Sequence, residues 1–301
     1  GSNNVAVGLN ALDANTTGSS NVSVGSGALG ANTTANNNTA VGTSSLLANT
    51  TGTSNVALGT NALGANTTAS NNTGLGFRAL HVNTTGASNT AVGAVSLDAN
   101  TTGSFNTAMG VHALGDSTTG ASLTAVGYAA LDKNTTGDSN VAIGESALGA
   151  NTTASNNTAV GTSALLANTT GAYNIAIGTN AVDANTTANY NIGIGYNALT
   201  TEASGEKNVA IGHAALEDSN GGNFNTAVGY GSLRNSTTAD NNTAFGYHAL
   251  VTNTTAADNV ALGSNALAAN TTGPRNTALG AFALDANTTA ADNTAVGTSS
   301  L

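Results

Sequence analysis

The sequence predicts an all-β fold, a parallel β-solenoid with 17-residue coils, about seventeen and a half of them. One pattern, N-T/V/I-A-V/I/L-G-x-x-A/S-L-x-A-N-T-T-G/A-x-x, repeats without insertion or deletion from Asn4 to Leu301. Gly occupies the fifth position of all eighteen copies, and Leu the ninth position of seventeen. A short fixed period is typical of stacked coils. No segment has the i, i+3, i+4, i+7 apolar pattern that would indicate a helix.

The first five positions of each repeat predict a strand followed by a bend. We number positions 1 to 17 from the Asn that begins each repeat, the first being Asn4, and call residues that share a position a rank. Rank 2 is always Thr, Val or Ile, and rank 4 is always apolar, so both favour a strand and share one face. We expect ranks 4 and 9, such as Val41 and Leu46, to be buried, and ranks 6, 7 and 10 to be exposed. Gly at position 5 predicts a bend that has no room for a Cβ atom or needs a positive φ.

Length and charge define the class of protein further. We expect residues 1–301 to form a single continuous solenoid cut from a longer repetitive chain, because both ends fall inside a repeat. The net charge is −10, and the five basic residues form no stripe that could neutralise phosphates, which argues against a nucleic-acid partner. No apolar run is long enough to cross a bilayer, so we expect no membrane insertion of this segment.

The N-T-T triplet at positions 12 to 14 is the most conspicuous motif. It has the form of an N-glycosylation acceptor. The structural alternative is that Asn turns a corner and the Thr hydroxyls bond to backbone, with the two Thr side chains divided between interior and surface. The candidate glycosylation or corner residues are Asn15, Asn32, Asn49, Asn66, Asn83, Asn100, Asn134, Asn151, Asn168, Asn185, Asn253, Asn270 and Asn287.

Two further surface features suggest binding functions. An outward Thr rank could order water, so ice binding is a further candidate function beside those given below. Aromatic residues concentrate at positions 6 and 17, either as a sugar-binding platform or as covers for the bends, and their irregular distribution favours the second reading. The stretch from Thr200 to Phe224, where two consecutive N-T-T corners are replaced, is the best candidate for a recognition patch, and any register break should fall at Glu202–Asn223.

Nothing in the sequence supports catalysis, so we expect no enzyme and no cofactor. The four histidines are far apart in the repeat array, and no His, Asp or Glu cluster has the spacing of metal ligands. Ser at position 8 has no His at a constant offset that could activate it.

Rank 3 never exceeds a small side chain. If rank 4 faces inward, alternation turns rank 3 outward and makes a flat stripe through which chains could pack, for instance at Ala40, Ala91, Ala142 and Ala210. Two alternatives are that tight bends exclude larger groups, or that rank 3 lines a second interior layer of the same coil.

The N-T/V-A-V/I-G core followed by A-L resembles the head repeats of YadA-type trimeric autotransporter adhesins and the N-T-A-V-G-x-x-A-L arrays of phage tail-fibre-like proteins. The resemblance implies a left-handed parallel β-roll whose chains associate as trimers and bind extracellular matrix. The adhesin repeat is shorter than 17 residues and has no counterpart of the N-T-T triplet.

Together these observations predict a structural or adhesive extracellular fibre at a cell or virion surface. Its expected partners are further copies of itself, as trimer or filament, and surface glycans or a host receptor. The alternative function is a receptor- or glycan-binding tail-fibre module.

Overall fold

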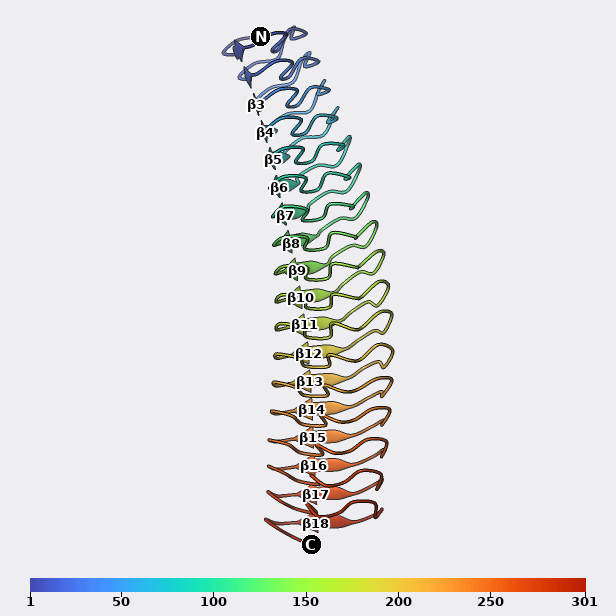
Figure 1. The fold of residues 1–301 in the computed structure, drawn as a ribbon. Helices are drawn as coiled ribbons and strands as arrows, with labels where there is room; N and C mark the ends of the chain where they lie inside the picture. Colours follow the sequence, from blue (N-terminus) through green and yellow to red (C-terminus); the bar gives the residue numbers. More distant parts are fainter. The chain divides into compact units, whose positions relative to one another are not determined.

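The computed structural model describes residues 1–301, and in it each repeat forms one coil with one three-residue strand (Figure 1). Neighbouring strands pair in parallel with a register of one repeat, so that Thr39 faces Val56 and Val41 faces Leu58. There is no helix. The predicted all-β solenoid with 17-residue coils is confirmed.

The chain divides into two compact units, Gly1–Ala154 and Ser155–Leu301, each described here by itself. Continuity of one solenoid over both units stays a prediction. The first unit holds β1 (Val5–Val7), β2 (Val22–Val24), β3 (Thr39–Val41), β4 (Val56–Leu58), β5 (Thr73–Leu75), β6 (Thr90–Val92), β7 (Thr107–Met109), β8 (Thr124–Val126) and β9 (Val141–Ile143). The second holds β10 (Thr158–Val160), β11 (Ile175–Ile177), β12 (Ile192–Ile194), β13 (Val209–Ile211), β14 (Thr226–Val228), β15 (Thr243–Phe245), β16 (Val260–Leu262), β17 (Thr277–Leu279) and β18 (Thr294–Val296).

Backbone hydrogen bonds between coils continue around the perimeter, well beyond the short strands. The N–H of Leu46 donates to the carbonyl of Ala62 at 3.0 Å, and that of Thr50 to the carbonyl of Thr67 at 2.8 Å. Parallel pairing also runs unbroken from β12 through β13 to β14. The irregular stretch between Thr200 and Phe224 therefore causes no register break.

The core consists of ranks 3, 8 and 9, which corrects one sequence prediction. Leu at rank 9 is buried as expected, with Leu46 fully inaccessible to solvent. Rank 4 is not buried in any coil: Val41 is half-buried, and Leu58 is 44 % exposed. Rank 3 takes its place inside. Rank 6 lies at the surface in every coil, and ranks 7 and 10 do so except at Gly115, Ala214 and Gly231.

Alternation over three residues fixes which ranks share a face but leaves open which face turns inward. Beside the rank 9 leucine, the interior has space for only a small side chain at rank 3. A Cβ built on Gly74 at rank 3 would already lie 3.4 Å from Cγ of Leu63 in the preceding coil. Alanine fills that distance, whereas a valine or isoleucine would overlap the leucine. Of the alternatives for rank 3, the interior layer is therefore correct.

The predicted association face was wrong for the same reason. Its four alanines lie in the core with no exposed surface: Ala40, Ala91, Ala142 and Ala210. The apolar side chains of rank 4 occupy the outer face of the strand instead.

Rank 5 shows why glycine is invariant. Gly93 has φ of +132°, and a Cβ built on it would lie 2.6 Å from the carbonyl oxygen of Gly110 in the next coil. Both predicted reasons, the positive φ and the missing space, apply. Ranks 7, 9 and 17 also turn through left-handed conformations without needing glycine, as at Ser44 (φ 56°), Leu46 (φ 48°) and Ser54 (φ 58°). Left-handed residues other than glycine cost about 1–2 kcal/mol each, which core packing and the interstrand ladder must offset.

A coupled pair of exceptions supports this description of the core. Val182 is the only rank 9 residue that is not leucine, and the next coil carries Gly193 at rank 3. A Cβ on Gly193 would overlap Cγ2 of Val182, while both Gly193 and Gly74 would meet a rank 8 carbonyl at 3.1 Å. The two glycines therefore differ mainly in their rank 9 neighbour.

Gly193→Ala is expected to destabilise the fold by about 1–3 kcal/mol, because it overpacks the site against Val182. Adding Val182→Leu should recover most of that loss, since it restores the pair that other coils contain. Gly74→Ala, beside a leucine, is the matched control and should be tolerated. Urea denaturation of the three variants measures the coupling, and equal costs for Gly193→Ala and Gly74→Ala would refute it.

Candidate functional site at the asparagine corners

The Asn residues of rank 12 lie inside the coil and form an amide ladder. In the coil of Asn66, its Nδ2 donates to Oδ1 of Asn49 in the preceding coil at 3.0 Å and to the carbonyl of Ala69 at 3.0 Å. The first bond joins coils, and the second closes the corner three residues on. Stacked amides of this kind are a recurrent feature of cross-β structures.

A second ladder, at rank 1, meets the first at the same carbonyl. Nδ2 of Asn55 donates to the carbonyl of Ala69 at 2.9 Å, and the backbone N–H of Asn55 donates to Oδ1 of Asn38 at 2.9 Å. Two amides of one coil, Asn55 and Asn66, thus converge on one carbonyl oxygen. Buried polar groups are stable only with partners, and this arrangement supplies them while closing the coil.

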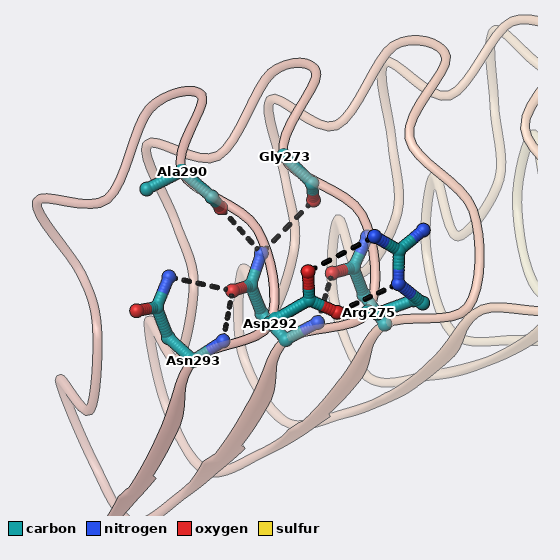
Figure 2. Close-up of polar contacts among 7 residues, drawn as sticks. Gly273, Arg275, Ala290, Asp292 and Asn293 are labelled. Atoms are coloured by element: carbon teal, nitrogen blue, oxygen red, sulfur yellow. Dashed lines mark hydrogen bonds and ion pairs between the residues drawn. The ribbon is translucent and has the colours of Figure 1, made fainter.

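Figure 2 shows the rank 1 ladder near the end of the second unit. The N–H and Nδ2 of Asn293 both donate to Oδ1 of Asn276, at 3.0 and 2.9 Å. Nδ2 of Asn276 donates to the carbonyls of Gly273 and Ala290, at 3.0 and 2.8 Å. The corner asparagines therefore have the structural role that the sequence offered as the alternative to glycosylation: they turn the corner of the coil.

The glycosylation reading of these corners needs correction. Eleven of the thirteen candidate asparagines are fully buried, and the other two, Asn15 and Asn287, are half-buried in the end coils. A glycan would replace a hydrogen of an Nδ2 that typically donates twice, as at Asn49 and Asn83, and it would have no path to solvent. At the eleven fully buried positions the folded coils therefore have no place for sugars.

The two Thr residues that follow differ in exposure, but neither enters the interior, so the predicted division between interior and surface was wrong. At rank 13, Oγ1 of Thr67 donates to the carbonyl of Thr84 in the next coil at 3.3 Å, and the side chain is half-buried. At rank 14, Thr68 is exposed. Only one of the two ranks is fully presented to solvent.

Four coils interrupt the rank 12 ladder, at Ser117, Glu202, Ser219 and Ser236, and all but the interruption at Ser219 leave buried polar atoms without partners. Ser117 lacks the amide that would reach Asn100, so Oδ1 of Asn100 and Oγ of Ser117 have no hydrogen bond. Oδ1 of Asn185 is likewise unpartnered before Glu202, and so is Oγ of Ser236. The rank 12 hydrogen bonds between coils are therefore weakest at these interruptions.

Glu202 occupies rank 12 as a fully buried carboxylate. Its Oε1 accepts hydrogen bonds from the backbone N–H groups of Ser204, Gly205 and Gly221, and its Oε2 accepts one from Oγ of Ser219 at 2.7 Å. Four donors compensate the burial of the charge. We predicted a recognition patch between Thr200 and Phe224. The two replaced corner residues of this stretch, Glu202 and Ser219, are buried in the interior.

Ser117→Asn is expected to raise the free energy of unfolding by about 1–3 kcal/mol, because it gives Oδ1 of Asn100 a partner and removes the unpartnered Oγ of Ser117. The new amide would donate to Oδ1 of Asn100 and extend the ladder towards Asn134. Ser139→Asn, at an exposed rank 17 position that holds Asn37 and Asn71 in other coils, is the control and should change little. A lower urea midpoint for Ser117→Asn than for the parent chain would contradict the ladder's role.

Every basic side chain has a partner. Arg275 pairs with Asp292 one coil away, at 2.7 and 3.0 Å, outside the asparagine ladder (Figure 2). This hydrogen-bonded pair lowers the pKa of Asp292. Lys133 lies 2.9 Å from both Asp132 and Asp116, and hydrogen bonds to them raise its pKa. The other partnered cations are Arg78 with Asp98, Arg234 with Glu217, and Lys207 over the ring of Phe224.

Aromatic rings form ladders that the sequence interpretation missed. Rings at rank 6 stack in four consecutive coils: Tyr196, His213, Tyr230 and Tyr247. The signal was present, because their numbers differ by 17 and only His213 interrupts the tyrosines. Treating histidine as a ring would have revealed the run.

No group of three or more His, Cys, Asp or Glu side chains is placed to hold a metal ion, and no pocket is present in either unit. None of the four histidines belongs to such a group: His81, His112, His213 and His248. None of the protein's segments is a helix of the length and hydropathy needed to cross a bilayer. Neither protein-family models nor curated protein sequences gave a match to this chain.

Proposed function

We propose that this chain is a segment of a structural and adhesive extracellular fibre, exposed at a cell or virion surface, and has no catalytic role. The observation that carries the proposal is the double asparagine ladder. Buried amides such as Asn55 and Asn66 are used to close each coil and join it to its neighbours. A chain that uses its buried polar groups in this way gains stiffness along the stack and lengthens by whole coils.

Self-association, as trimer or filament, is part of the proposal, with the outer face of the strands as the contact in place of rank 3. Rank 4 is apolar in every coil although it is never buried. Examples are Met109 and Leu262, which are 46 % and 48 % exposed. Large exposed apolar surfaces usually mark interaction sites.

Deletion of whole coils tests the proposal that the chain is a stiff spacer whose length is set by the number of coils. Removing residues 38–88, which are three complete repeats, should preserve the β-type circular dichroism and shorten the particle by about 14 Å, at ~4.8 Å per coil. Removing only residues 38–46 leaves an incomplete coil of eight residues, which should interrupt the stack at that point and lower the free energy of unfolding. Particle length by electron microscopy is the measurement, and an unchanged length after the three-coil deletion would contradict a spacer.

A further inference from the structure

The outer strand face of the second unit differs from that of the first in composition. Five of the six isoleucines of the chain lie at ranks 2 and 4 of three consecutive strands, β11 to β13: Ile175, Ile177, Ile192, Ile194 and Ile211. All five are half-exposed or exposed. Phe245 continues rank 4 in β15 and is 41 % exposed. No charged residue occupies rank 2 or rank 4 anywhere in the chain.

A ladder of rings borders this apolar strip on the rank 6 side. Ring centroids are 5.2 Å apart between Tyr196 and His213, 4.8 Å between His213 and Tyr230, and 5.6 Å between Tyr230 and Tyr247. The interplanar angles are 23°, 6° and 18°, so the rings stack. About half of each tyrosine is exposed. Because stacking covers the faces of the inner rings, the ladder offers ring edges and polar ring atoms to a partner.

Rank 17 borders the other side of the strip. Tyr173 and Tyr190 stack with centroids 5.2 Å apart and an interplanar angle of 8°. Farther along the same rank, the ammonium group of Lys207 lies 5.0 Å from the ring centroid of Phe224. Aromatic and other apolar side chains are enriched in the cores of protein–protein interfaces. We call ranks 17, 2, 4 and 6 from Tyr173 to Tyr247 the aromatic patch.

The aromatic patch reaches the lower size limit of a biological contact. From rank 17 to rank 6 the chain advances six residues, about 20 Å, and each coil adds ~4.8 Å along the stack, so a coil presents roughly 100 Å². Five coils present about 500 Å² per copy, and the nine strands of the unit about 900 Å². A specific interface needs around 800 Å² per partner, and biological contacts begin near 1,000 Å² in total.

We infer that the aromatic patch is the contact through which the second unit binds a second copy of this chain, side by side. Its ranks repeat at the strand spacing over many coils, and side chains can interdigitate along such a surface only with a partner of the same pitch. A second copy supplies that pitch. The second unit is acidic, with nine acidic and three basic side chains, but the aromatic patch contains none of the acidic ones and only one basic residue, Lys207 at rank 17.

This inference rests on the proposed self-association and adds its location. The test replaces patch residues by threonine, which other coils already hold at ranks 2 and 6, as at Thr39 and Thr43. The patch variant combines Ile175→Thr, Ile192→Thr, Val209→Thr, Tyr196→Thr, Tyr230→Thr and Tyr247→Thr. The matched control makes six such changes in the first unit: Val22→Thr, Val56→Thr, Val141→Thr, Phe77→Thr, Val111→Thr and Tyr128→Thr.

Sedimentation equilibrium of the full chain over a concentration series measures the association constant. The patch variant is expected to weaken association by roughly 100-fold or more, and the control by less than about fivefold, with circular dichroism unchanged in both. Equal weakening by both variants, or by neither, overturns the patch as the contact. A parent chain that stays monomeric at every concentration overturns self-association itself. If the patch variant fails to fold, the three rank 2 changes alone provide the same comparison.

Discussion

Gly93→Ala is expected to be among the most damaging single methyl additions in the first unit. The new Cβ would lie 2.6 Å from the carbonyl oxygen of Gly110, at a φ of +132° that L-residues rarely adopt. The neighbouring coil cannot withdraw, because parallel bonds hold the strands on both sides of β6. Strain and overlap together should lower the free energy of unfolding by about 4 kcal/mol, in the upper range for point changes.

Gly27→Ser is the control for this substitution. Gly27 also has a positive φ, +68°, but a Cβ on it would meet nothing closer than 3.5 Å. Ser44 and Asn61 hold the same rank 7 position at φ of 56° and 58°. The urea midpoint of Gly27→Ser should therefore equal that of the parent chain within experimental error. A Gly93→Ala variant as stable as Gly27→Ser would refute the account of rank 5.

Leu148→Ala is the second change with a large expected effect. Leu148 is fully buried, and it is the only large side chain that its coil places in the core. Small neighbours and fixed ladders prevent the walls from collapsing on the cavity, so a loss of about 2–5 kcal/mol is expected. Leu166→Ala, at a rank 10 position that is 36 % exposed, should cost much less. Equal losses for the two would mean that rank 9 is not the core of the coil.

The sequence was sufficient for the period, the strand at positions 2 to 4, the bend at Gly93 and the burial of Leu148, since each follows from a fixed spacing and a steric rule. It was insufficient for the inward face of the strand. Val41 is larger and more apolar than Ala40, and hydrophobicity alone puts the larger residue inside. The deciding fact is the narrow distance to the facing leucine, which is a property of the closed coil and not of the strand.

The corner asparagines illustrate a different limit. A buried amide ladder and an N-glycosylation acceptor require the same residue types, so Asn49-Thr50-Thr51 is compatible with either reading. Burial of Asn49 distinguishes them. The exceptions to the consensus were more informative than the consensus itself. The pair Val182 and Gly193 identifies the contact between ranks 9 and 3 of neighbouring coils, and Ser117 identifies the rank 12 amide that would bond to Asn100.

The two asparagine ladders have a direction, and this has a consequence for synthesis. Oδ1 of Asn38 accepts from the coil that follows it in the chain, and Oδ1 of Asn49 does the same. A coil that has just folded therefore exposes acceptors that the next 17 residues of nascent chain can satisfy. Within each unit, folding can proceed from the N-terminal end as the chain emerges, by local additions to an existing template, and no search for distant partners is needed.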